Sequence, residues 1–207
     1  MHRKHVEPDR MGAFSDAVIA VVITIMVLEL RPPEGHSLAA LAPLWPTAIS
    51  YGVSYLFIAI IWMNHHHLLR FVRHAGPELL WLNFAHLFAV SLLPFATAWL
   101  ADSRLSPVPV AAYAGIFVIV DLAYFAFERA VIRQADTGDF PTSAQRRARR
   151  RSLATVLIFA AAIPVAIVLP WLAFAMICAA LVLYVRPEAP ADIAIVGART
   201  RNPENVD

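Results

Sequence analysis

Long apolar runs separated by short polar segments cover most of the chain. The runs predict six membrane-spanning helices, at residues 13–30, 43–69, 76–100, 108–132, 152–169 and 170–185. Eighteen helical residues extend about 27 Å, which just spans the hydrocarbon core of a bilayer. Pro94 predicts a kink in the third helix, and Pro170 predicts a tight break between the last two. The pattern therefore predicts an all-α membrane protein, with one six-helix domain at 1–187 and a disordered polar tail at 188–207.

Composition and charge agree with this pattern. The 207 residues are 59% hydrophobic and 15% charged, whereas a soluble domain carries about 25% charged residues. Fifteen of the seventeen lysine and arginine residues fall in the head, in the tail, after the second span, or in the last turn of the fourth span and the segment that follows it. Because positive charge gathers on the cytoplasmic side, both termini are predicted to be cytoplasmic. The basic run at 146–151 is explained by this bias and by anionic lipid, in preference to nucleic-acid binding.

The first apolar run is predicted to remain as a membrane helix. It carries Asp16 and Glu29 near its two ends, and Arg31 and two prolines follow where a cleaved signal peptide would have small residues. Asp16 is interpreted equally well as a headgroup-level carboxylate or as an interior anchor for this helix. Glu29 and Glu34 would form an acidic ring that concentrates cations only if four or more copies surrounded an axis.

One narrow face of the first helix is a candidate pore wall. At helical spacing, this face brings together Ala17, Val21, Thr24 and Leu28. The four side chains are small or branched, and Thr24 supplies the one hydroxyl group in the middle of the span. The potassium-filter sequence T-V-G-Y-G is absent, so a filter lined by backbone carbonyls is not expected.

The other polar residues in the apolar runs do not indicate a metal site, a disulfide or an enzyme. His65, His66 and His67 are expected at the cytoplasmic surface rather than in a metal site, because no cysteine or nearby acid completes one. Asp121 is interpreted as a structural hydrogen-bonding residue, with a proton relay as the competing view. Cys178 has no partner for an intrachain disulfide. The chain shows no nucleotide loop, metalloprotease motif or nucleophile site, so we expect neither an enzyme nor a cofactor or resident metal.

The start of the first span resembles a family signature. The R-x-x-x-F-S-D pattern of the transmembrane-protein-175 family of potassium channels, in its bacterial six-helix form, matches Arg10, Phe14, Ser15 and Asp16. The rest of the span resembles the family's first helix, and residues 62–66 resemble the end of its second helix. The resemblance covers the plan of the whole chain, and its specific motif is confined to about twenty residues.

The resemblance implies a homotetramer in the plasma membrane, embedded in lipid, with the first helix of each chain lining a K⁺ pore. It places the apolar constriction on Val21, which is smaller than the isoleucine or leucine expected there. Thr24 and Leu28 are the next inward-facing positions, so the implied pore wall coincides with the helical face above. The resemblance also implies a polar network that ties the first helix to the second and third, comprising Arg10, Ser15, Asp16, Trp62 and His65.

The predicted function is a weakly selective potassium leak channel. Such a channel passes ions through an apolar ring that is narrower than a hydrated ion. Without the resemblance, a channel and a transporter are equally compatible with the residues. The competing hypotheses are a proton-coupled secondary transporter using Asp121 and His86, a metal-binding membrane protein using His65 to His67, and a purely structural membrane subunit.

Overall fold

The computed structural model describes residues 6–134 and 142–185, and every element in these two ranges is a helix. In chain order the elements are α1 (Val6–Val27), the 3₁₀ helix η1 (Leu38–Leu44), α2 (Trp45–Leu69), α3 (Pro77–Ser91), α4 (Leu93–Asp102), α5 (Pro107–Gln134), α6 (Thr142–Val168) and α7 (Pro170–Val185). The prediction of an all-α fold is confirmed. The tail at 188–207 lies outside the described residues.

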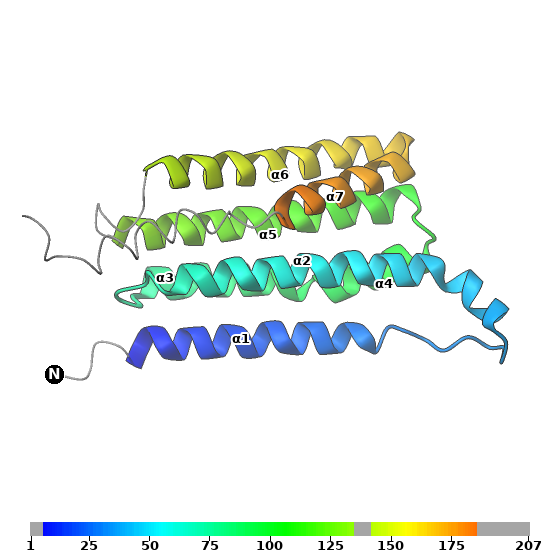
Figure 1. Cartoon of the computed structure of the whole chain (residues 1–207), viewed down its shortest axis with the longest axis horizontal. Helices are drawn as coiled ribbons and strands as arrows, with labels where there is room; N and C mark the ends of the chain where they lie inside the picture. The colour runs from blue at the N-terminus through cyan, green and yellow to red at the C-terminus, as the bar shows by residue number, and fades with distance from the viewer. Residues whose placement is uncertain (1–5, 135–141, 186–207) are drawn as a thin grey trace, which may run out of the picture.

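The helices run side by side along one axis (Figure 1). α1 forms one outer face of the bundle, α6 and α7 form the opposite face, and α2, α3, α4 and α5 lie between them. α1 packs against α2, α3 and α4. We call the end where α1 begins the first end, and the end where α1 stops and η1 lies the second end.

Two proline breaks lie where the sequence predicts them. The third apolar run is divided into α3 and α4 beside Pro94, because proline lacks the amide proton that a continuous helix requires. Pro170 begins α7 directly after Leu169, which confirms the tight turn between the last two apolar runs. α6 begins at Thr142 rather than at residue 152, so the basic run lies inside a helix. Arginine is a good helix former, which explains the earlier start.

Apolar length supports a multi-pass membrane protein. Four segments are long and apolar enough to cross a membrane, at Asp9–Val27, Leu38–Leu69, Pro77–Asp102 and Pro107–Gln134. The remaining two apolar helices are shorter, at Ser152–Val168 and Pro170–Val182. Apolar helices of this length span the same thickness only where the bilayer thins or where flanking side chains extend to the interface. The six-span prediction is therefore met for four spans by length, while the last two spans stay a prediction.

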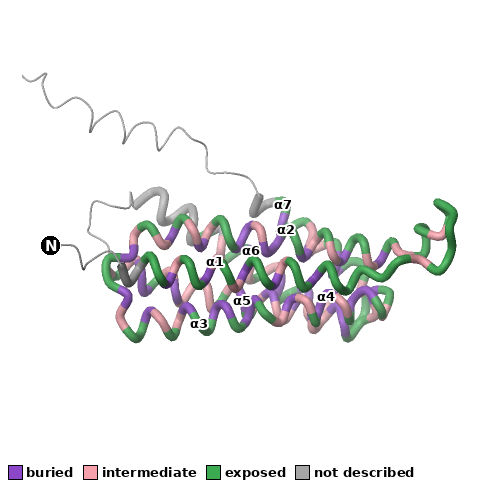
Figure 2. The backbone as a smooth tube through the Cα atoms, turned by 90° about the horizontal axis from the view of Figure 1, so that it is seen from below, coloured by how far each residue is buried: buried purple, intermediate pink, exposed green. Residues whose placement is uncertain are grey.

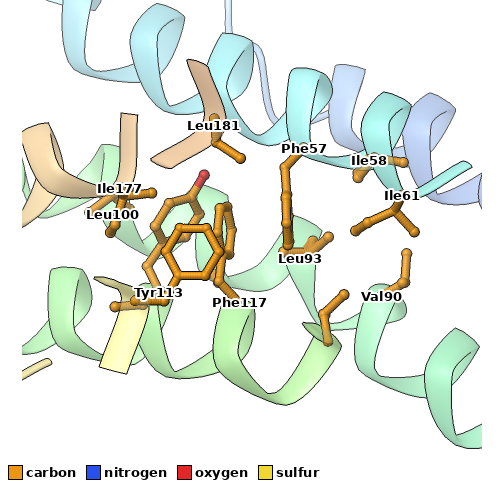
Figure 3. Close-up of a cluster of buried hydrophobic side chains, with 14 of the residues drawn as sticks. Phe57, Ile58, Ile61, Val90, Leu93, Leu100, Tyr113, Phe117, Ile177 and Leu181 are labelled. Carbon is orange, nitrogen blue, oxygen red and sulfur yellow. The ribbon is translucent and has the colours of Figure 1, made fainter. Parts of the chain in front are cut away.

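α2, α4 and α5 pack around a common core, and α1 packs on α2 and α4. The rings of Phe57 and Phe117 stack with centroids 3.7 Å apart (Figure 3). Nearby, the Ser54 hydroxyl lies 2.7 Å from the Thr97 hydroxyl and 2.6 Å from the Tyr113 hydroxyl. All three hydroxyl groups are buried, so they satisfy one another where water is excluded. The contact joins α2, α4 and α5 into one rigid unit.

Candidate functional site

α1 presents two faces with opposite character. One face is buried against α2, α3 and α4, and its residues recur at helical spacing: Met11, Ser15, Ile19, Val22 and Met26. The other face looks away from the bundle, and the exposed turns of α1 are visible in Figure 2. Val21 is 54% exposed there, and Ala17 and Thr24 are exposed beside it. Three of the four predicted pore-wall residues therefore share an uncovered helical face.

Leu28 is the exception among the predicted pore-wall residues. α1 ends at Val27, so Leu28 lies in the turn that follows, where its amide donates to the carbonyl of Ile25 at 2.9 Å. Its side chain is 78% exposed. The expectation that Leu28 continues the helical face is wrong for this reason, although the residue stays at the same end of α1.

The hydroxyl of Thr24 is oriented by its own helix. Its Oγ1 donates a hydrogen bond to the backbone carbonyl of Val21 at 2.8 Å. Because the hydroxyl proton is used in this bond, the lone pairs of the oxygen remain free on the exposed side. A cation passing this face would meet an oxygen ligand one turn beyond the apolar side chain of Val21.

The buried face of α1 is anchored by an amide that joins three helices. Asn83, on α3, accepts a hydrogen bond from His65 Nε2 at 2.8 Å and donates one to Ser15 Oγ at 2.9 Å. Ser15 Oγ also donates to the carbonyl of Met11 at 2.9 Å. The amide oxygen can only accept, so the proton of His65 must lie on Nε2. Ser15, His65 and Asn83 are fully or almost fully buried. We call these three residues the polar anchor.

A second contact ties α1 to α2 at the edge of the polar anchor. Trp62 Nε1 donates to the carboxylate of Asp16 at 2.9 Å, and the ring of His66 stacks on Trp62 with centroids 5.4 Å apart. Asp16 is half-buried, which favours its interpretation as an anchor of α1. Arg10 is exposed, and in the described part of the chain no hydrogen bond or ion pair joins it to Asp16. Phe14 is 48% exposed and meets the ring of Phe84 edge-on.

The structure thus divides the predicted network into two parts. Ser15 and His65 meet through Asn83, and Asp16 meets Trp62, whereas Arg10 stands apart. The expectation that all three histidines lie at the surface is wrong for His65, which is buried and packs flat between His86 and Phe127. Within residues 6–134 and 142–185, no group of three possible ligands could hold a metal ion.

Asp121 has a local partner on a neighbouring helix. Its carboxyl group on α5 lies beside the side chain of Thr155 on α6, which is buried and donates its hydroxyl proton to the carbonyl of Ser152 at 2.9 Å. Tyr113, eight residues earlier on α5, bonds to Ser54 of α2. The pairing of Asp121 across α5 and α6 fits a structural role, and it places this acid away from α1.

The Asp16–Trp62 contact gives a first prediction. Trp62→Phe keeps a flat ring over His66 but removes the N–H that bonds Asp16. We expect the free energy of unfolding in detergent to fall by about 1 kcal/mol, because one charge-assisted hydrogen bond at a half-exposed site is lost. The measurement is thermal unfolding followed by circular dichroism. Trp81→Phe is the matched control, since Trp81 is 74% exposed on α3. An equal change in both variants would contradict the role given to this bond.

Known proteins resemble this chain over the region that holds the site. The family model described as endosomal/lysosomal potassium channel TMEM175 matches residues 10–94, which include most of α1, all of α2 and α3, and the polar anchor. The chain is 44% identical over 124 residues to a potassium channel of Chryseobacterium sp. (strain P1-3), over 60% of this chain and 65% of the relative. It is 37% identical over 128 residues to a potassium channel of Streptomyces collinus, over 58% of this chain and 62% of the relative. Both matches cover less than two thirds of the relative's own length.

A solved structure agrees with the fold. The crystal structure of a lysosomal potassium-selective channel TMEM175 homolog from Chamaesiphon minutus superposes with a TM-score of 0.74, covering 86% of this chain and 96% of that one. At 24% sequence identity this likeness establishes the arrangement of the helices. The residues that carry the sequence match are those of α1, α2 and α3, which also form the candidate site.

Proposed function

We propose that the chain, which matches the TMEM175 family of channels over residues 10–94, conducts potassium ions passively through a homotetramer whose four α1 helices line the pore. The observation that carries this proposal is the two-faced character of α1. One face is fixed to the bundle by the polar anchor, while Ala17, Val21 and Thr24 remain uncovered. In a tetramer, this uncovered face of α1 would point toward the central axis and line the pore.

Potassium selectivity in such a pore comes from desolvation. Four Val21 side chains form an apolar ring, and an ion must shed part of its water shell to pass it. K⁺ holds its water less tightly than Na⁺, so the ring favours K⁺. The Thr24 oxygens, whose protons are engaged by the Val21 carbonyls, replace part of the lost shell on one side of the ring. The discrimination is weak, because the ring itself offers no ligand to the ion.

The charges at the two ends of the bundle fit a cation pore with a defined orientation in the membrane. Glu29 and Glu34 lie exposed just beyond α1 at the second end, where a ring of four copies attracts cations to the mouth of the pore. Most lysine and arginine residues fall in segments that the six-span topology assigns to the first end. This bias supports a cytoplasmic first end and an outer second end in the plasma membrane. The proposal requires K⁺ as the permeant ion and includes no cofactor.

Passive flux separates the channel from a proton-coupled transporter. In liposomes loaded with K⁺, we expect the purified protein to release K⁺ down its gradient with no pH difference applied. Asp121→Asn, which keeps the size of the side chain beside Thr155, should leave this flux within about twofold of wild type, because Asp121 lies away from α1. Flux that appears only with a pH gradient and disappears in Asp121→Asn would support the transporter instead.

A further inference from the structure

The segment between α1 and α2 leaves the body of the protein. We call residues 31–44 the outer arm; it ends in η1, in which no residue is buried. The arm extends past the second end of the bundle, and in Figure 2 it bends away from the side of α3 and α4. Leu38 is 86% exposed and Leu41 is 52% exposed. Among the described residues, η1 packs mainly on α2, and both of these leucines are left exposed.

An open groove lies on the side of α1 that faces α3 and α4. It runs between α1 and the segment 91–98, has a volume of about 670 Å³, and is lined mostly by apolar side chains. We call it the α1–α4 groove. Its α1 wall includes Val18 and Ile25 and also Ala17 and Val21, so the groove begins at the edge of the pore-wall face. Phe95 and Ala98 form part of its α4 wall, and Glu29 marks its outer end. Phe95 is 63% exposed, so the chain's own residues leave this wall open.

The position of α1 relates the arm to the groove. α1 packs against α2 on one flank and against α3 and α4 on the other. If α1 faces a central axis, each copy must present its α2 flank to one neighbour and its α3–α4 flank to the next. Such contacts are heterologous, and a four-fold rotation between copies closes them into a ring. The outer arm continues the α2 flank past the second end, which brings it toward the α4 flank of the neighbouring copy at the same end.

We propose that the outer arm of each copy docks in the outer end of the α1–α4 groove of the adjacent copy. Leu38 and Leu41 supply the apolar side chains, and Ile25 and Ala98 form the wall that receives them. The inference rests on the proposed function, because it requires the ring. It also gives the arm a role in conduction, since the docked arm would brace the α1 helix that carries Val21.

Cysteine crosslinking tests this contact. In a Cys178→Ala background, the full chain carries Leu38→Cys together with Ala98→Cys, and the purified protein is treated with a short bis-maleimide. Because every chain then holds both halves of a heterologous contact, we expect crosslinked dimers, trimers and tetramers on a denaturing gel. Each single variant should stay monomeric. The matched control pairs Leu38→Cys with Val108→Cys, a residue 58% exposed at the second end on α5, and should give no ladder.

The other outcomes overturn the docking, and they distinguish its failure from a failure of the proposed function. Dimers from Leu38→Cys alone would show that two arms meet each other rather than the groove. The absence of a ladder, in a preparation that has the mass of a tetramer and conducts K⁺, would show that the arm lies in lipid or water and that the proposed function stands. A preparation that is monomeric and passes no K⁺ would remove the proposed function and the docking together.

Discussion

Val21→Ala is expected to raise passive K⁺ flux by about tenfold and to reduce the preference for K⁺ over Na⁺. The substitution removes two methyl groups from each of four side chains at the constriction, so the ring widens and an ion keeps more of its water. A tenfold change corresponds to a barrier lowered by about 1.4 kcal/mol. Val21→Asn should act in the same direction, because an amide wets the ring. Flux from liposomes into K⁺-free and Na⁺-containing buffers measures both quantities.

Val27→Ala is the matched control for this prediction. It removes the same two methyl groups from the same helix, and Val27 is 49% exposed, but it lies off the face that carries Ala17 and Val21. Its flux and ion preference should equal those of wild type. If both Val21 variants also behaved as wild type, Val21 would not be part of the filter.

Asn83→Leu is expected to lower the stability of the protein by about 2–4 kcal/mol. The change removes the acceptor for His65 and the donor for Ser15, and each buried polar group left without a partner costs about 1–3 kcal/mol. Total stabilities are about 5–15 kcal/mol, so the change removes a large part of the stability and should lower the yield of correctly assembled protein. The measurements are the melting temperature in detergent and the fraction of monodisperse tetramer.

Two further variants define the outcome for Asn83. Ser91→Ala removes a hydroxyl that bonds only within its own helix on the exposed side of α3, and its melting temperature should be unchanged. Asn83→Asp keeps an acceptor for His65 but loses the donor to Ser15, so it should fall between Asn83→Leu and wild type. A melting temperature for Asn83→Leu equal to that of wild type would contradict the anchoring role.

Much of the fold could be predicted from the sequence because lipid imposes strict local rules. A membrane span must satisfy its own backbone hydrogen bonds, so apolar length and proline position locate helices directly. This logic placed the breaks beside Pro94 and Pro170. It did not anticipate the start of α6 at Thr142, because a run of arginines has the polarity of a loop while keeping the backbone preference of a helix.

The candidate site could be predicted only where it depends on local periodicity. The exposed face with Ala17, Val21 and Thr24 follows from helical spacing within one segment. Asn83 was missed because its partners are distant in the chain: it lies 68 residues from Ser15 and 18 from His65. A single amide in the apolar run 77–91 was the available signal.

Three adjacent histidines project in three directions, and sequence alone could not show which one faces α3. Packing against Phe127 and bonding to Asn83 select His65, while His66 stacks on Trp62 and His67 is exposed. The same limit applies to Arg10, whose motif position suggested a partner that the described structure does not provide.

The most direct test of the pore is the block of K⁺ flux by Ag⁺, a thiol-reactive ion of about the size of K⁺. Val21→Cys and Val22→Cys are compared in a Cys178→Ala background, and Val22 is 5% exposed on the buried face of α1. If α1 lines the pore, Ag⁺ should abolish flux through Val21→Cys and leave flux through Val22→Cys intact. Undiminished flux through Val21→Cys, or block at Val22→Cys alone, would show that ions pass elsewhere.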